Sequence, residues 1–193
     1  MSSLNVYGIE AKNASTNIIS LASGTQIYEP NTIIQTLTVR SDLRTTYASP
    51  ITGNGTTIAA LNTTITPKRS SSLLLITWMI NGEMHHDNVF TIHQDNSLIT
   101  TTGFQGFNNE AGNVRWSGIA SAFYDRNEDS TPSNWIIQYA VSAGSTTSRT
   151  YAPAVRSSTG TAYTFAFNRT IVGSIGDSHE SMVSTGMIME IAQ

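Results

Sequence analysis

Carboxylates are the first residues in this chain that could carry acid–base chemistry. The 193 residues include 13 Asp and Glu, and cleavage of a glycosidic bond would need two of them about 5–10 Å apart. Most lie in turn-forming stretches, where we expect them to keep loops soluble. The run Asp125–Asp129 matches the first five positions of a calcium-binding loop, but Ser130 replaces the Gly of position six and Ile136 the Glu of position twelve. The sequence therefore predicts neither a catalytic carboxylate pair nor an EF-hand, and a looser oxygen-ligand site remains an alternative.

Histidines are the next candidates. His85, His86 and His93, together with Asp87, form the one histidine cluster of the sequence. Successive strand residues point to opposite faces, so His85 and Asp87 could share a site from one strand whereas His85 and His86 could not. In a three-fold assembly, one histidine from each chain could also hold an axial metal ion. The plainer interpretation is that these are polar loop residues, and the sequence predicts no metal and no other cofactor.

Nucleophilic catalysis has little support in the sequence. There is no cysteine, which excludes disulfides, thiolate metal sites and cysteine nucleophiles. There is no Gly-x-Ser-x-Gly elbow for a serine nucleophile and no glycine-rich loop for binding phosphate. We therefore expect a protein that is not an enzyme.

Aromatic residues in and beside two polar stretches, 103–113 and 125–134, give the clearest binding signal: Phe104 and Phe107 lie in the first, Trp116 follows it, and Tyr124 and Trp135 flank the second. Aromatic rings offer apolar faces to the C–H groups of a sugar, and nearby Asn and Asp can bond its hydroxyls. The alternative is that Phe104 and Phe107 fold inward and seal one end of the domain. The predicted binding residues of these distal loops are Phe104, Phe107, Asn108, Trp116, Tyr124, Asp125, Asn127, Asp129 and Trp135.

Composition excludes some classes of partner and indicates the fold class. Only 12% of residues are charged, whereas 27 Thr, 24 Ser and 15 Asn supply most of the polarity. With 10 Lys and Arg against 13 Asp and Glu, the chain has too few cations to track phosphates, so nucleic acid is not an expected partner. The longest apolar run, Leu73–Ile76, is too short to span a bilayer, so membrane insertion is not expected. Abundant Thr, Ile and Val, with few of the residues typical of surface helices, predict an all-β fold.

The elements that must position these residues are short strands. From about residue 32 onward, eight or nine apolar or Thr-rich runs alternate with turn clusters, which predicts a β-sandwich or jelly roll. In 135–141 and 163–167 every second residue is apolar, as in a strand with one face on a core. Residues 1–31 differ from the rest, with isolated apolar positions and Pro30-Asn31 at the boundary. They are either a loosely ordered terminus or a short β-rich stem or docking segment, followed by a head domain over 32–193.

One strand breaks the alternation. Residues 73–80 are apolar on both parities, so the strand must be covered on both faces. A two-layer sandwich covers only one face, which predicts that another copy of the chain covers the second. The alternative is a central strand lying beneath a long loop of the same chain. The predicted interface residues are Leu74, Ile76, Trp78 and Ile80, or else those of the opposite parity.

Four segments together resemble fibre and other virion proteins of tailed phages, especially marine ones. The first is Ile65-Thr66-Pro67-Lys68-Arg69-Ser70-Ser71-Ser72-Leu73-Leu74-Leu75-Ile76, which resembles the entry strand of those proteins. The others are Asp87–Asp95, the ending from Phe167 through Ile191, and the opening Ser3–Ile9. The resemblance spans most of 33–192 as a loose pattern of strands.

This resemblance implies a homotrimeric jelly-roll head, similar to the heads of complement and tumour-necrosis-factor-like proteins. The C-terminal strand, with Met187 and Met189, would join the interface around the three-fold axis. The implied location is the virion surface, with residues 1–31 docking on other virion proteins and the head attaching to a host-surface glycan or protein. The alternative is a subunit that decorates or cements the capsid or tail without binding a receptor. A polysaccharide-cleaving enzyme is a more distant third possibility. Phage fibres usually carry a long shaft, whereas only about 31 residues precede the head here, which favours a short fibre, a tip or a decoration subunit.

Overall fold

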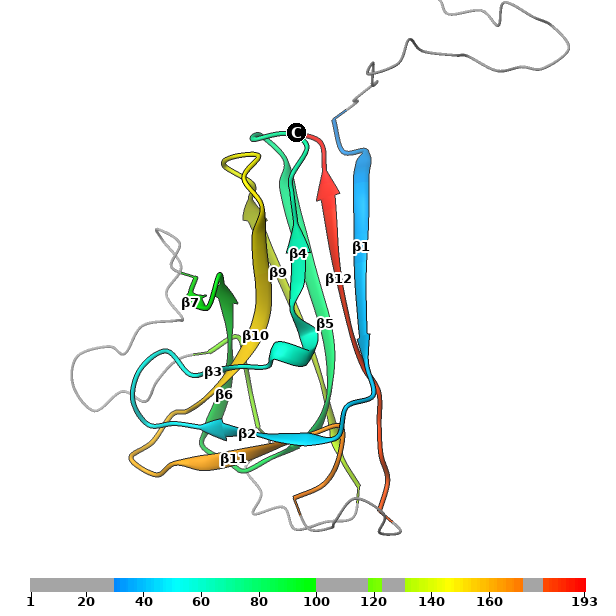
Figure 1. The fold of residues 1–193 in the computed structure, drawn as a ribbon. Helices are drawn as coiled ribbons and strands as arrows, with labels where there is room; N and C mark the ends of the chain where they lie inside the picture. The colour runs from blue at the N-terminus through cyan, green and yellow to red at the C-terminus, as the bar shows by residue number, and fades with distance from the viewer. Residues whose placement is uncertain (1–29, 100–117, 123–130, 172–178) are drawn as a thin grey trace, which may run out of the picture.

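The computed structural model describes residues 30–99, 118–122, 131–171 and 179–193 (Figure 1). Within these ranges the chain is almost entirely β, as its composition predicts, with one single-turn 3-10 helix at Ala59–Leu61. The strands are β1 (Ile33–Ser41), β2 (Thr45–Ser49), β3 (Thr56–Thr57), β4 (Thr63–Ile65), β5 (Leu73–Met84), β6 (Asn88–Gln94), β7 (Ser97–Leu98), β8 (Ala120–Ser121), β9 (Ser133–Ser142), β10 (Arg149–Ser157), β11 (Tyr163–Phe167) and β12 (Ser184–Ile191).

The strands form two antiparallel sheets that pack against each other. Sheet I has the order β1-β12-β5-β11-β2, and β9 pairs with β5 on its other side. Sheet II has the order β3-β10-β6-β7, with β4 also on β10 and β8 on β6. The chain passes between the sheets at several connections, including β4 to β5, β5 to β6 and β9 to β10. The all-β sandwich predicted from the sequence is therefore confirmed.

The core lies between the sheets and is built from alternate strand residues. Its largest fully buried side chains include Trp78, Phe90, Tyr151, Phe165 and Phe167, which come from both sheets. This burial follows from the period-two alternation of the strands, because every second side chain points to the same face.

Gly186 shows how closely the layers pack. It lies opposite Trp78 in the register of β12 and β5. A Cβ at this position would meet Cδ1 of the Trp78 indole at 2.5 Å. Glycine therefore leaves the room that the largest side chain of the core requires.

The sandwich has two distinct ends. The described N-terminal and C-terminal residues bond to each other, with Asn31 N donating to Ala192 O at 2.8 Å and Ala192 N donating to Thr32 O at 2.9 Å. From this terminal pole β5 runs its whole length, about 40 Å for a strand of its size, to a distal pole. Figure 1 shows the start of β1 and the C-terminus at one end and β2 and β11 crossing at the other.

The predicted segment boundary falls two residues before β1. Residues 1–29 lie outside the described residues, so the stem or docking segment stays a prediction. Among the helices of the described ranges, none is long and apolar enough to cross a membrane.

Candidate functional site

The outward side of sheet I carries the most distinctive surface of the described chain. Its register aligns outward residues in rows across β12, β5 and β9, such as Met189, Leu75 and Ala140. We call this surface the open face. Its outward residues on the four long strands are Thr36, Thr38, Arg40, Leu73, Leu75, Thr77, Met79, Asn134, Ile136, Gln138, Ala140, Ser142, Thr185, Met187, Met189 and Ile191.

The structure corrects which parity of β5 could meet another chain. Leu74, Ile76, Trp78 and Ile80 have no exposed surface, because they point into the core of their own protomer. The prediction that these four residues lie at a subunit interface is therefore wrong, and the opposite parity faces outward. Met187 and Met189 do lie on the outward parity of β12, where they pair with Thr77 and Leu75. Their place in an interface stays a prediction.

The open face is apolar along its centre and reaches solvent. Met79 and Ile136 are register partners and are 39% and 69% exposed, and Ile33, at the terminal end of the same sheet, is 59% exposed. Among the outward residues described on the four strands, Arg40 alone is charged. Thr residues of β1 and the polar residues of β9 flank the apolar stripe made by β12 and β5. Such a contiguous stripe marks a surface that is suited to contact with a protein.

The outward side of sheet II is built differently, because side chains of β10 and β6 hold residues 50–57, the last two of which form β3 at the edge of this sheet. We call this segment the strap. Two small residues of β10, Ala152 and Ala154, are buried, as is Thr91 of β6. Gly55 has φ of +95°, and a Cβ there would meet Val155 O at 2.7 Å. The strap therefore approaches the sheet more closely than a residue with a side chain allows.

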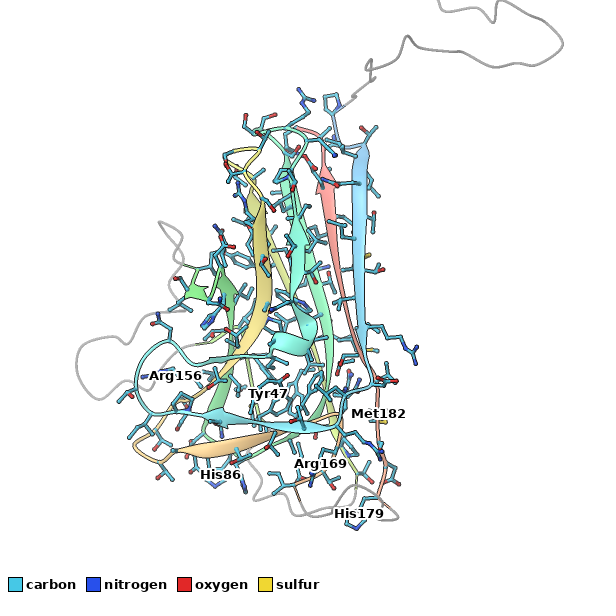
Figure 2. The ribbon with its side chains drawn as sticks, in the orientation of Figure 1. Tyr47, His86, Arg156, Arg169, His179 and Met182 are labelled. Atoms are coloured by element: carbon cyan, nitrogen blue, oxygen red, sulfur yellow. The ribbon has the colours of Figure 1, made fainter. Side chains whose placement is uncertain are left out.

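Arg156 anchors the strap through backbone carbonyls (Figure 2). Its Nε donates to Gly53 O at 2.7 Å and its Nη2 to Ile51 O at 2.9 Å. Its Nη1 donates to Ser157 O at 3.3 Å. Burial lowers the pKa of this guanidinium from its usual value. The fork geometry of arginine lets one side chain hold several carbonyls of a loop at once.

His93 holds the strap from the neighbouring strand. Its Nε2 lies 2.9 Å from Asn54 O, and its Nδ1 lies 2.7 Å from Thr57 Oγ1. A carbonyl only accepts, so we assign the proton to Nε2, and Nδ1 accepts from the Thr57 hydroxyl. Burial lowers the pKa of His93, against a smaller rise from its bond to Asn54. His93 is therefore a neutral side chain whose two ring nitrogens both bond to the strap, which leaves neither nitrogen to ligate a metal ion.

The turn between β5 and β6 brings three rings together at the distal pole. The ring of Tyr163, at the start of β11, lies 5.3 Å from that of His85 and 6.0 Å from that of His86. His86 Nδ1 lies 3.1 Å from Asp87 Oδ2, and these two side chains are 20% and 11% exposed. We call these four residues the distal cluster. Figure 2 shows His86 at the end of the sandwich that lies away from the C-terminus.

Trp135 is a packing residue in this structure. Its ring lies 5.3 Å from that of Phe90 and 6.2 Å from that of Phe165, in edge-to-face contacts, and its Nε1 donates to Ser121 O at 3.2 Å. Trp135 is partly exposed as well, so its place in a ligand-binding surface stays a prediction. The remaining predicted binding residues lie outside the described residues, namely Phe104, Phe107, Asn108, Trp116, Tyr124, Asp125, Asn127 and Asp129.

The buried carboxylate of Glu190 has a structural role. It accepts hydrogen bonds from the backbone N–H groups of Lys68 and Arg69 and from the Gln35 amide. Burial alone would raise its pKa, but these hydrogen bonds outweigh burial and leave the pKa below its usual value. The carboxylate thus stays ionised and fixes the turn before β5. In the described ranges, no group of three or more His, Cys, Asp or Glu is placed to hold a metal ion.

Neither a family model nor a curated protein matches this chain.

Proposed function

We propose that this chain is a fibre-type virion protein whose head assembles as a homotrimer and attaches to a host-surface glycan or protein, without enzymatic activity. The open face is the single observation that carries the proposal. Its apolar stripe is partly exposed in the protomer, as at Met79 and Ile136. Burying such a stripe between copies would remove apolar surface from water and so stabilise an assembly.

The dimensions of the open face favour a ring of copies over a flat pair. Four strands at a spacing of about 4.8 Å and eight residues at about 3.3 Å give a face of about 500 Å². A stable pairwise interface buries about 800 Å² on each partner. In a three-fold ring each protomer meets two neighbours, so the stripe lies near the axis and the flanking strands add area on both sides. A trimer would therefore share the stripe and its flanking strands between two neighbours.

The two poles support a head that points outward. Residues 1–31 lead into β1 at the terminal pole, next to the C-terminus. If this segment docks on the virion, the distal pole faces away from the particle. A surface rich in Ser, Thr and Asn, with 12% charged residues overall, suits contact with neutral hydroxyl groups and depends little on ionic strength.

Location on the particle tests the proposed function. Antibodies raised against the chain and coupled to gold would be applied to phage particles from the source culture and viewed by negative stain. Labels at the tail tip support host attachment. Labels spread over the capsid would favour a decoration subunit instead, and particles without label would contradict a virion role. Loss of turbidity when the protein is added to capsular polysaccharide would contradict the non-enzymatic assignment.

A further inference from the structure

We propose that the distal cluster of His85, His86, Asp87 and Tyr163 binds a neutral sugar. The inference rests on the proposed attachment function and names its ligand class and its residues. The cluster joins a turn and a strand that lie 78 positions apart in the chain, and it lies at the pole opposite the described ends of the chain.

The turn that carries the histidines is rigidly held. Asn88, itself buried, donates from Nδ2 to the carbonyls of His85 and His86 at 2.8 and 3.2 Å. Ser158 donates to Asp87 O from both its backbone N, at 2.6 Å, and its hydroxyl, at 2.9 Å. Asp87 has φ of +64°, a conformation that costs energy for a residue other than glycine. Backbone held in this way presents its side chains in one arrangement, which reduces the entropy lost on binding.

The chemistry of the cluster fits a hydroxylated ring. The faces and edges of the Tyr163, His85 and His86 rings supply apolar surface for sugar C–H groups, with partial exposure at each side chain. The imidazoles and the phenol can donate or accept hydrogen bonds, and the Asp87 carboxylate accepts from hydroxyl groups. That carboxylate repels an anionic ligand, so a neutral sugar is favoured over a sialic or uronic acid.

Saturation-transfer NMR on the full chain tests this inference. The probes are the methyl glycosides of glucose, galactose, mannose and N-acetylglucosamine, with N-acetylneuraminic acid and glucuronic acid as the acidic arm. We expect transfer to at least one neutral glycoside. Tyr163→Leu should weaken its affinity about tenfold, because one aromatic contact is lost, whereas Tyr163→Phe should retain it. His85→Leu is the second variant, and it provides the same test if Tyr163→Leu does not fold.

His179→Leu is the matched control. It removes another partly buried imidazole, which lies 3.3 Å from the Thr170 hydroxyl and outside the cluster, and it should leave binding unchanged. Transfer to no neutral glycoside, transfer only to acidic sugars, or equal binding by the Leu variants would each overturn the inference. Light scattering on the same samples separates the two proposals. A trimer that binds no sugar refutes only this inference, and a monomer that binds sugar through the cluster refutes only the assembly.

Discussion

The outward sides of the two sheets differ in the side chains they present and in how far these reach solvent. Sheet II presents small and polar residues such as Ala154 and Thr91, which are buried, and its Arg156 and His93 bond the strap of the same chain. Sheet I presents a stripe of Leu, Ile and Met that still reaches solvent at Met79 and Ile136. The strap shows what an intramolecular cover looks like in this protein, with a cation and an imidazole holding backbone carbonyls. The open face has apolar side chains where sheet II has these anchors, and the proposed assembly rests on this difference.

The largest effect is expected from charges placed on the open face. Leu75→Glu combined with Met79→Glu puts two carboxylates on the apolar stripe of β5. An unpaired charge buried at an interface costs about 3–5 kcal/mol, so the assembly should dissociate while each protomer stays folded. Light scattering measures the first outcome and circular dichroism the second. Thr146→Glu, at an exposed residue of the loop between β9 and β10 and outside the open face, is the control and should leave the mass unchanged. A double variant with the mass of the wild type would show that the open face is not the interface between copies.

The next largest effect is expected at the anchor of the strap. Arg156→Met keeps the aliphatic stem and removes the group that bonds Ile51, Gly53 and Ser157 carbonyls. We expect a loss of about 3 kcal/mol in the free energy of unfolding, because several buried acceptors lose a charged donor. Urea denaturation measures this loss, and light scattering should show an unchanged mass. Arg40→Met, which removes an exposed arginine of β1, should cost little. Equal stability of the two variants would mean that Arg156 is not an anchor.

A smaller effect is expected where the strap touches the sheet. Gly55→Ala combines a positive φ with a Cβ only 2.7 Å from Val155 O, and we expect a cost of about 2 kcal/mol. Gly53→Ala is the matched control, because Gly53 also has positive φ but nothing lies within 4 Å of its Cβ. It should cost about 1 kcal/mol, from backbone conformation alone. Thermal unfolding of both variants would reveal the difference, and equal midpoints would argue against close approach of the strap.

The smallest effect is expected from the titration of His93. Folding lowers the pKa of His93 below its ordinary value of 6.5, so near that pH the unfolded chain binds the proton more readily. The stability that His93 contributes is thus complete above about pH 6.5, falls as the pH drops through the folded pKa, and then levels off. His93→Gln should remove this component. The urea midpoints of wild type and variant are compared between about pH 7.5 and 5, and their difference should change as the pH falls. A difference that stays constant with pH would contradict a His93 that is neutral in the folded protein.

The alternation of apolar and polar residues predicted the fold, but it did not show which face of β5 points into the core. Both parities of residues 73–80 are apolar, so a period of two says only that there are two faces. One available signal was Thr77, the single polar residue of the run, which lies on the outward parity. Another was Arg156, a lone cation after the apolar residues of β10, which marks a buried anchor. The pairing of Tyr163 with His85 had no such signal, because tertiary structure alone brings these distant residues together.

The native mass of the full chain tests the central claim most directly. Multi-angle light scattering over a dilution series should give three times the chain mass of 20.8 kDa. A mass of 20.8 kDa at every concentration would show that the protomer tolerates its open face in water. That result would contradict the account of the open face as a surface that copies of the chain cover for one another.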